Sequence, residues 1–568
     1  MTSKTATAQA IYEQLEGQLS KERVTELLEA PKYEHMGDIA FPCFALASLQ
    51  HQNPKLIAEV LAEQLREQCS SQFERVESVG PYVNMFYQKE EVATSVLSTI
   101  IEKGNAYGTQ YEGDGKTITM DLSSPNIAKP FSMGHLRSTV IGSAIANLLE
   151  KCGYKVVRIN YLGDWGTQFG KLIAAYTWWG EEEKVRLNPI QELLKLYVRF
   201  HREAEQDDAL NNKGREWFQK LENGDAYATS LWEWFREESR KEFQNIYDLL
   251  GVSFDSYKSE AYHHPQTPAI ITKLQEKGLL VRSEGAEVVS LDDYGMPPAL
   301  IKKSDGTTLY TTRDLAAAVD RMETYHFTES LYVVGNEQSL HFEQLKAVLV
   351  KMGYEWADKL IHVPFGMMLR DGKKMSTRKG KVVFLQEVLE KAIQLAEANI
   401  EEKNPLLENK EIVARKVGVG AVIFHDIKHH RSNDIEFSYD DMLRFDGETA
   451  PYLQYTYARG CSLLAKGAPM PQTTSLLFAQ DDMETMWPII KLLQEFPDII
   501  KASAGEYNPA RLAKYLLQLA QSFNRFYTKV RVLEESTFQQ TRITIVFAVT
   551  TVLKEGLRLL NIEAPTKM

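Results

Sequence analysis

The sequence has few cysteines and no long apolar run. Its four cysteines lie far apart and match no zinc-site or disulfide spacing, so we expect no dedicated metal site and a reducing compartment. The apolar stretch at residues 543–553 is shorter than the roughly 20 residues that a membrane helix needs. Residues 1–15 are polar and lack the apolar segment of a signal peptide. These absences predict a cytoplasmic protein with no membrane partner.

The chain also lacks an excess of positive charge. It carries 65 Lys and Arg against 77 Asp and Glu, which gives a formal net charge of -12. If that charge were evenly spread, it would argue against a nucleic-acid partner, since phosphate backbones bind cationic surfaces. Residues 509–568, however, hold nine Lys and Arg and only four acidic residues, a balance of +5, with aromatic residues among them. Such a segment can bind unpaired bases, or it can be an ordinary bundle helix with charges outside.

The length and composition predict a globular protein of three or four domains. Apolar residues make up 44% and charged residues 25% of the 568 positions. Residues 1–110 read as a small α+β domain, with helical patterns at 6–28 and 54–68 and short strands at 73–79 and 82–87.

From residue 116 the pattern alternates between strand and helix. Strands are expected at 117–122, 155–161, 331–334 and 360–363, and helices at 134–152 and 340–353. Two βαβ units of this kind imply a Rossmann-type parallel sheet with helices packed on it. We assign this α/β domain to residues 111–384, with a charged helical insertion at about 180–285.

The rest of the chain reads as helical. Helices are expected at 385–401, 411–425, 450–464, 486–504, 510–532 and 542–560. Residues 385–445 are interpreted as a helical connecting region and 446–568 as a C-terminal all-α bundle.

The first candidate site is SSPNIAKPFSMGHLR at residues 123–137, where the first strand of the sheet ends and a helix begins. Ligands bind at the carboxyl ends of parallel strands, and the free N–H groups of a helix N-terminus suit a polyphosphate. Gly134 lets a ligand approach the backbone, and His135 can hydrogen-bond a phosphate or ribose oxygen. The alternative is a plain strand-to-helix connection with a glycine required for packing.

The second candidate site is DGKKMSTRKGK at residues 371–381, with five basic side chains and two glycines. A cationic loop of this kind can close on a triphosphate and neutralise the charge that develops as pyrophosphate leaves. The alternative is a solvated surface turn.

Together the two segments resemble the HIGH and KMSKS motifs of class I aminoacyl-tRNA synthetases. SSPN at 123–126, NYLGDWGTQFG at 160–170, YTTRD at 310–314 and TAPYLQY at 449–455 are similar to arginyl-tRNA synthetases of the bacterial type. The resemblance covers essentially the whole chain. It implies ATP-dependent activation of L-arginine to arginyl-adenylate, followed by transfer to the terminal adenosine of tRNA(Arg).

This sequence departs from the two motifs in two places. Ser132 stands where HIGH has its first histidine, and Thr377 stands where KMSKS has its second lysine. In some relatives a lysine just before the HIGH motif is thought to replace that second lysine, and Lys129 is placed for this role.

The resemblance also implies the site residues. The catalytic residues would be His135, Lys374, Ser376 and Lys129. ATP would be bound by Ser132, Gly134, His135, Gly335, Asn336, Met368, Lys374, Met375 and Ser376. Arginine would be bound by Asp121, Ser124, Asn126, Tyr310, Asp314 and Gln338. The tRNA would be contacted by Asn84 in the N-terminal domain and by Phe526, Tyr527 and Arg531 in the C-terminal domain.

An arginine pocket is also reasonable on physical grounds. Guanidinium offers five N–H donors in a planar fork, so its pocket needs acceptors such as a carboxylate. Tyr310 and Asp314 are four residues apart, and they face one cleft if Thr312 caps the helix that follows. Each residue also has a simpler explanation, since Asp314 can stabilise a helix dipole and Asp121 can pair at the end of a strand.

No cluster of ligands for a resident metal is apparent, so Mg²⁺ is expected to arrive with ATP. No heptad pattern suggests a dimer, and a monomer is expected. Two other functions stay open: a non-catalytic tRNA-binding paralogue, and a class I synthetase for another amino acid.

Overall fold

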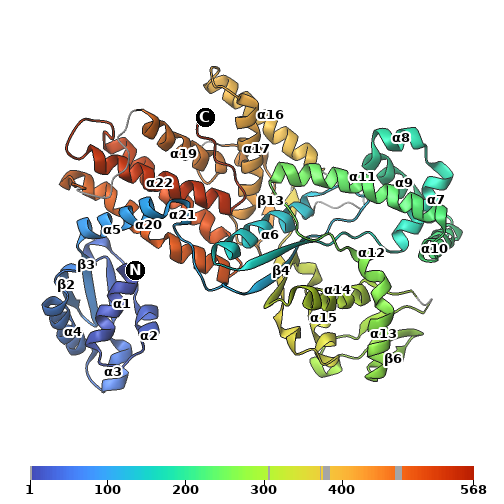
Figure 1. The fold of residues 1–568 in the computed structure, drawn as a ribbon, viewed down its shortest axis with the longest axis horizontal. Coiled ribbons are helices and arrows are strands. Elements are labelled where there is room, and N and C mark those ends of the chain that lie inside the picture. The colour runs from blue at the N-terminus through green and yellow to red at the C-terminus, as the bar shows by residue number, and fades with distance from the viewer. Residues whose placement is uncertain (1–2, 305–306, 371, 375–383, 445, 467–475) are drawn as a thin grey trace. The chain divides into compact units, whose positions relative to one another are not determined.

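The computed structural model describes residues 3–304, 307–370, 372–374, 384–444, 446–466 and 476–568 (Figure 1). The chain divides into two compact units, and each takes in more than one stretch of sequence. Unit 1 consists of Met1–Tyr107, Arg459–Asp498 and Gln518–Leu553. Unit 2 consists of Gly108–Ala458, Ile499–Leu517 and Lys554–Met568. Among the described residues, no helix is both long and apolar enough to span a bilayer.

The N-terminal part of unit 1 is a three-stranded antiparallel sheet with helices packed against it (Figure 1). The strands are β1 (Ile39–Pro42), β2 (Phe73–Val79) and β3 (Tyr82–Tyr87), in the order β1-β3-β2. The helices are α1 (Ser3–Gln14), α2 (Lys21–Leu27), α3 (Phe44–Gln50), α4 (Pro54–Gln68) and α5 (Lys89–Lys103). β2 and β3 match the two predicted strands residue for residue.

The prediction of a single helix over residues 6–28 is wrong, because the helix is interrupted between α1 and α2. Glu16 and Gly17 adopt left-handed backbone conformations, with φ of 48° and 84°, which end a right-handed helix. The Ser20 hydroxyl then caps α2 by accepting a hydrogen bond from the backbone N–H of Arg23 at 3.2 Å. A glycine inside the predicted helix was the available signal of the break.

The C-terminal region is helical, as predicted. Its helices are α19 (Ala450–Ala465), α20 (Gln480–Gly505), α21 (Ala510–Lys529) and α22 (Gln539–Leu559). Within unit 1, α19 and α22 approach closely at Gly460, where an added β-carbon would lie 2.2 Å from Thr550 Cγ2. The buried ion pair between Arg542 and Asp482, at 2.7 Å, ties α22 to the start of α20.

Unit 2 is built on a four-stranded parallel sheet in the order β10-β9-β4-β5. The strands are β4 (Thr117–Ser123), β5 (Lys155–Asn160), β9 (Glu329–Gly335) and β10 (Leu360–Phe365). Helix α6 (Met133–Lys151) connects β4 to β5, and α15 (Ser339–Lys351) connects β9 to β10. The predicted Rossmann-type sheet and its two βαβ units are therefore confirmed. An added β-carbon at Gly142 would lie 2.4 Å from Leu122 Cβ, so this glycine lets α6 pack closely on β4.

The order of the strands determines where a ligand can bind. β4 and β9 are neighbours in the centre of the sheet, but their crossover helices lead to opposite edges. The carboxyl ends of two such strands form a topological switch point, where open α/β sheets bind ligands. Residues 124–126 and 336–338 follow these two strands directly.

The insertion between β5 and β9 is mainly helical. Its helices are α7 (Thr167–Trp179), α8 (Glu182–Leu187), α9 (Pro189–Ala204), α10 (Ala209–Glu222), α11 (Ala226–Leu250), α12 (Glu260–His263) and α13 (Thr267–Glu276). A small antiparallel sheet that the sequence pattern did not predict follows, with strands β6 (Leu280–Ser283), β7 (Ala286–Val289) and β8 (Ala299–Lys302). Helix α14 (Tyr310–Tyr325) then leads into β9.

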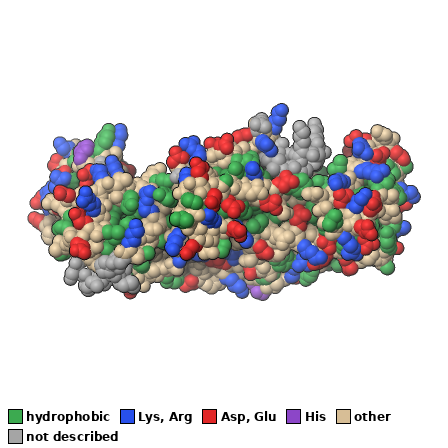
Figure 2. Space-filling model, turned by 90° about the horizontal axis from the view of Figure 1, so that it is seen from above, with side chains coloured by type: hydrophobic (Ala, Val, Ile, Leu, Met, Phe, Trp, Pro, Cys, Tyr) green, Lys and Arg blue, Asp and Glu red, His purple; other side chains and the backbone are tan. Residues whose placement is uncertain are grey.

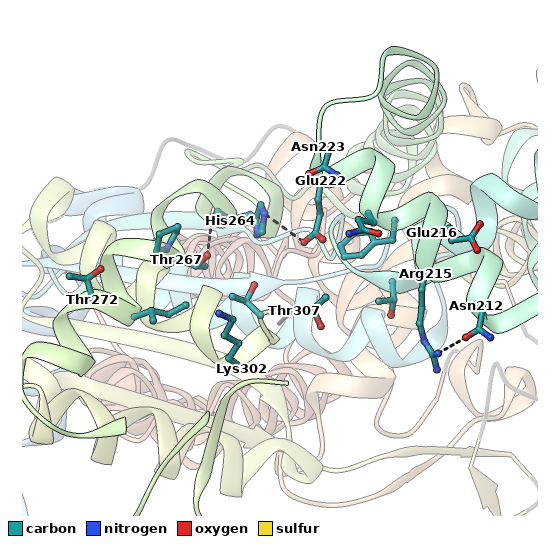
Figure 3. Close-up of a pocket in the computed structure, with 16 residues that line it drawn as sticks. Asn212, Arg215, Glu216, Glu222, Asn223, His264, Thr267, Thr272, Lys302 and Thr307 are labelled. Atoms are coloured by element: carbon teal, nitrogen blue, oxygen red, sulfur yellow. Dashed lines mark hydrogen bonds and ion pairs between the residues drawn. The ribbon is translucent and has the colours of Figure 1, made fainter. Parts of the chain in front are cut away.

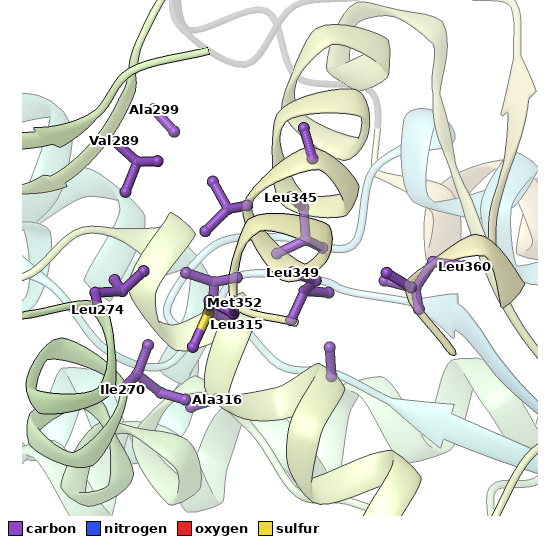
Figure 4. Close-up of a cluster of buried hydrophobic side chains, with 14 of the residues drawn as sticks. Ile270, Leu274, Val289, Ala299, Leu315, Ala316, Leu345, Leu349, Met352 and Leu360 are labelled. Carbon is purple, nitrogen blue, oxygen red and sulfur yellow. The ribbon is translucent and has the colours of Figure 1, made fainter. Parts of the chain in front are cut away.

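A buried apolar cluster holds α14 and α15 against this small sheet and α13 (Figure 4). Leu315 on α14, Leu345 and Leu349 on α15, and Leu274 on α13 are fully buried in it. Burial of this size stabilises each such side chain by about 1.5–3 kcal/mol. The cluster fixes the start of α14 and the start of α15 relative to the sheet.

The remaining elements follow β10. A short sheet has the order β12-β11-β13, with β11 (Met368–Arg370), β12 (Lys373–Lys374) and β13 (Ile435–Glu436). The helices are α16 (Leu385–Lys403), α17 (Lys410–Ile427) and α18 (Tyr439–Met442). Short 3₁₀ helices lie at Glu34–Met36, Gly104–Ala106, His264–Gln266, Asp292–Tyr294, Asn336–Gln338 and Glu355–Lys359.

Candidate active site

A cavity of about 320 Å³ lies at the switch point. It brings together seven residues predicted to bind ATP or arginine, namely Ser124, Gly134, His135, Gly335, Asn336, Gln338 and Met368. Its remaining lining residues come from α6, the end of β9 and the β10–β11 connection, namely Arg137, Ser138, Val333, Val334, Glu337, Phe365, Gly366 and Met367. Segments about 200 residues apart in sequence thus meet at one site.

His135 is held in one protonation state by its surroundings. The backbone N–H of Ser132 donates a hydrogen bond to Nδ1 of His135 at 3.1 Å. Burial lowers the pKa of His135 to about 4, and the charge of Lys129 adds to this effect. The ring is therefore neutral at pH 7. Because Nδ1 accepts a hydrogen bond, Nε2 carries the proton and can donate it to an anionic oxygen.

Gly134 is not required by packing. The nearest atom to an added β-carbon would be Ser132 Oγ at 3.7 Å, an ordinary contact. This argues against the alternative explanation of Gly134 as a packing glycine. Its small size instead leaves open space at the first turn of α6, at the edge of the cavity.

Arg137 holds the segment at Gly366–Met368, which lines the cavity, against α6. This residue is 1% exposed, and its guanidinium donates to the carbonyls of Gly366 at 2.7 Å, Asn433 at 2.9 Å and Arg431 at 3.3 Å. Asp426 balances its charge at 3.2 Å. An added β-carbon at Gly366 would lie 2.5 Å from the Asn433 carbonyl oxygen, so only glycine fits there. Arg137 thus joins the helix that carries His135 to the segment before β11.

Next to the cavity, three carboxylates are paired with arginines of the chain itself; Asp121 and Asp164 are buried, and the side chain of Glu260 is 18% exposed. Asp121 lies 3.0 Å from Arg321, Glu260 lies 3.2 Å from Arg313, and Asp164 lies 3.0 Å from Arg236. Sequence reasoning had selected only Asp121 from this set. The others were missed because each pair joins residues far apart in the sequence, and no local pattern indicates such partners.

Burial raises the pKa of Asp121, Asp164 and Glu260, the last to about 7. Arg321 opposes this rise at Asp121 and Arg313 opposes it at Glu260, while the charge of Asp314 adds to the rise at both. These carboxylates are therefore close enough to Asp314 for their charges to interact.

Asp314 differs from these carboxylates in its partner. Its Oδ2 atom lies 2.7 Å from Nε2 of His341, which is its ion-pair partner among the described residues. The ring of Tyr310, which is 50% exposed, meets the His341 ring edge-on with centroids 4.9 Å apart. Tyr310 and Asp314, which were predicted to face one cleft, thus contact the same side chain.

The predicted start of this helix was wrong. α14 begins at Tyr310 itself, and Thr312 does not cap it. The Thr312 hydroxyl instead donates to the carbonyl of Ile301 at 2.6 Å and ties α14 to β8. Asp314 consequently lies in the second turn of the helix, which removes the alternative explanation based on the helix dipole.

The other predicted residues lie around this site. The Ser124 hydroxyl donates to Asp121 at 2.8 Å, and Gln168 donates to Asn126 at 3.4 Å. The Lys129 ammonium lies 3.4 Å from Gln168 Oε1 and 5.0 Å from the centre of the Tyr197 ring. Lys129 does not line the cavity, although its charge acts on His135.

Part of the second motif lies outside the described residues. This applies to Met375 and Ser376 and to the side chain of Lys374, whose backbone belongs to β12.

Two of the predicted tRNA contacts, Asn84 and Phe526, have buried side chains. Phe526 is fully buried, and Asn84, in β3, is 2% exposed. Tyr527 is 38% exposed, with the Arg459 guanidinium 4.7 Å from its ring centre, and Arg531 is exposed. On the face shown in Figure 2, basic and acidic side chains interleave, and the basic side chains form no continuous patch there.

A larger cavity of about 800 Å³ lies in the insertion, between α10, α13 and β8 (Figure 3). Charges of both signs line it, including Arg215, Glu216, Glu222 and Lys302. None of the predicted site residues belongs to it.

The fold and the switch-point cavity are those of a class I aminoacyl-tRNA synthetase. The family model described as "tRNA synthetases class I (R), catalytic domain" matches residues 96–439. The models "Arginyl tRNA synthetase N terminal domain" and "DALR anticodon binding domain" match residues 4–87 and 453–568.

Comparison with similar proteins identifies the family within this class. The chain is 53% identical to "Arginine--tRNA ligase 2" of Bacillus anthracis and 52% identical to "Arginine--tRNA ligase" of Enterococcus faecalis, each over the full length of both chains. It matches the structure of the Thermus thermophilus arginyl-tRNA synthetase with a TM-score of 0.79 and 25% identity, covering 99% of both chains. The chain belongs to the arginyl-tRNA synthetase family.

Proposed function

We infer that this chain is an arginine–tRNA ligase, which activates L-arginine with ATP and transfers it to tRNA. Its full-length relatives and its catalytic domain support this activity. The assignment of individual residues to ATP and arginine is our proposal, and it rests on the geometry of the switch-point cavity and of the carboxylates next to it.

The observation that carries the arginine assignment is the charge of Asp314. Asp121, Glu260 and Asp164 are each paired with an arginine of the chain. The described partner of Asp314 is His341 and not an arginine. Asp314 is therefore the carboxylate left to receive a ligand guanidinium bidentately. Tyr310, whose ring is half exposed, would cover the guanidinium plane, since arginine stacks on aromatic faces.

The amino-acid end of arginine would lie toward β4. Asp121 and Ser124 are hydrogen-bonded at 2.8 Å, and Ser124 lines the cavity. We propose that these two residues and Asn126 hold the α-ammonium and orient the carboxylate. Gln338 lines the cavity at the start of α15, and we assign it to the arginine side chain.

ATP would occupy the cavity itself. Gly134 and neutral His135 would face its phosphates, and Gly335, Asn336 and Met368 would face its adenosine. The arginine carboxylate attacks the α-phosphate, a bond forms between the carboxylate oxygen and phosphorus, and pyrophosphate leaves. Positioning and electrostatic stabilisation are sufficient for such a step, with Nε2–H of His135 donating to a phosphate oxygen. Lys374, Ser376 and Lys129 stay proposed participants.

The second step transfers the arginyl group to a ribose hydroxyl of the terminal adenosine of tRNA(Arg), the 2′ hydroxyl by resemblance to class I enzymes. We propose Tyr527 and Arg531 as exposed residues of the helical domain that contact this tRNA. The described residues contain no group of three or more His, Cys, Asp or Glu side chains able to hold a metal. We propose that Mg²⁺ is carried in with ATP, and we assign no step to it. A cytoplasmic monomer is proposed.

The direct test is ATP–pyrophosphate exchange with purified protein, with and without tRNA. We expect exchange that requires L-arginine, and we expect tRNA to be needed for it, as in relatives that charge arginine. If no amino acid supported exchange under either condition, the chain would be a tRNA-binding paralogue rather than a ligase.

A further inference from the structure

We propose that His341 is a positioning residue for the guanidinium site, which fixes the carboxylate of Asp314 and the ring of Tyr310. This inference rests on the proposed function and deepens it. His341 lies in the first turn of α15, next to the cavity residue Gln338. No motif in the sequence identified it, because its two partners lie about 30 residues earlier on α14.

The hydrogen bond between His341 and Asp314 has a defined direction. The Nε2 atom of His341 and the Oδ2 atom of Asp314 are 2.7 Å apart. An ionised carboxylate can only accept hydrogen bonds, so Nε2 must carry the proton. The bond fixes the plane of the carboxylate. It uses one lone pair of Oδ2, and both oxygens keep lone pairs that a two-pronged ligand can use.

The His341 ring is itself held tightly. Its centroid lies 4.9 Å from that of Tyr310 at an interplanar angle of 63°, and 5.2 Å from that of Phe342 at 66°. Phe342 in turn stacks on His362 at 4.7 Å. A ring with neighbours on several sides cannot swing away from Asp314 without disturbing the packing of α15.

Exposure separates the roles of these residues. Tyr310 is 50% exposed and the side chain of Asp314 is 20% exposed, so both are accessible to a ligand. The side chain of His341 is only 9% exposed. His341 therefore acts through Asp314 and Tyr310 and not by contact with the substrate.

The orientation of the carboxylate matters more for arginine than for other cations. A guanidinium makes two parallel hydrogen bonds only when the carboxylate lies in its plane, whereas an ammonium needs one contact in any direction. Loss of the His341 bond should therefore weaken the binding of arginine and leave the binding of ATP intact. A hydrogen bond to a charged group typically contributes about tenfold or more in affinity.

The test compares His341→Leu, His341→Asn and His341→Gln in the full-length protein. Glutamine can place an amide N–H near the position of Nε2, whereas asparagine is too short and leucine has no donor. The Michaelis constants for arginine and ATP are measured by pyrophosphate exchange with tRNA present. The control is His425→Leu, which removes a buried Nε2 hydrogen bond of 2.8 Å to the carbonyl of Glu436, away from Asp314. Melting temperatures are recorded for all four variants.

We expect Leu and Asn at position 341 to raise the KM for arginine about tenfold or more, with the KM for ATP within twofold of wild type. Glutamine should restore the KM for arginine to within about threefold, and His425→Leu should leave it unchanged. The inference is overturned if all three substitutions leave the KM for arginine within threefold of wild type. It is equally overturned if the substitutions raise the KM for arginine and the KM for ATP by the same factor. It is also overturned if His341→Gln raises the KM for arginine as much as His341→Leu does. Absence of arginine-dependent exchange in the wild type would instead contradict the proposed function.

Discussion

Replacing Asp314 by asparagine removes one negative charge from the proposed guanidinium site and keeps the shape of the side chain. His341 can still donate to the amide oxygen, so we expect the fold of α14 to be preserved. The three nearby carboxylates stay paired with Arg321, Arg313 and Arg236 and cannot supply the missing charge. Truncating one partner of a buried, hydrogen-bonded charge pair costs about 2–5 kcal/mol. This corresponds to a loss of roughly 30- to 5000-fold in kcat/KM for arginine.

The assay is arginine-dependent pyrophosphate exchange in the presence of tRNA, with the KM for ATP measured in parallel. Asp320→Asn is the matched control, because Asp320 lies on the same helix and pairs with Lys258 at 2.8 Å. We expect the control to keep the wild-type kcat/KM for arginine. The reasoning is refuted if Asp314→Asn stays within threefold of wild type, or if the control loses as much activity.

Three further predictions concern the switch-point cavity, which we propose as the ATP site. Arg137→Lys removes the planar fork that holds the carbonyls at 366 and 433, so the KM for ATP should rise about tenfold while the KM for arginine stays unchanged in exchange kinetics. Gly134→Ala should have a wild-type melting temperature but bind ATP weakly in calorimetry. Gly366→Ala should instead have a lower melting temperature, because its β-carbon would lie 2.5 Å from the carbonyl oxygen of Asn433. His135 has a pKa near 4 in the folded protein against an ordinary value of 6.5, so the unfolded state binds more protons between these values. Its contribution to stability is complete above about pH 6.5 and lost as the pH falls toward 4, and urea unfolding of wild type against His135→Asn across this range should show a smaller pH dependence in the variant.

The sequence predicted those parts of the fold that have local signals. Strands 73–79 and 82–87 were found because Gly80 and Pro81 mark the turn between two β-rich runs. The first half of the cavity was found for a similar reason, since Gly134 and His135 lie in the first turn of the helix that follows a buried strand and its connection. A local pattern could also suggest that Tyr310 and Asp314 lie on one side of α14.

Features that depend on contacts across the chain were not predictable in this way. Arg321, Glu260 and His341 lie beside the proposed site only because α12, α14 and α15 meet beside the sheet, and no spacing in the sequence brings them together. The burial of Phe526 was likewise not predictable from the sequence alone. An aromatic residue on an amphipathic helix can face solvent or the core, and packing in the helical domain placed it in the core.

The measurement that tests the central claim most directly is aminoacylation of total bacterial tRNA with each of the twenty amino acids in separate reactions. We predict that only L-arginine is esterified to tRNA in an ATP-dependent reaction, and that Asp314→Asn abolishes most of this activity. Charging with another amino acid, or charging with arginine that does not depend on Asp314, would contradict the account.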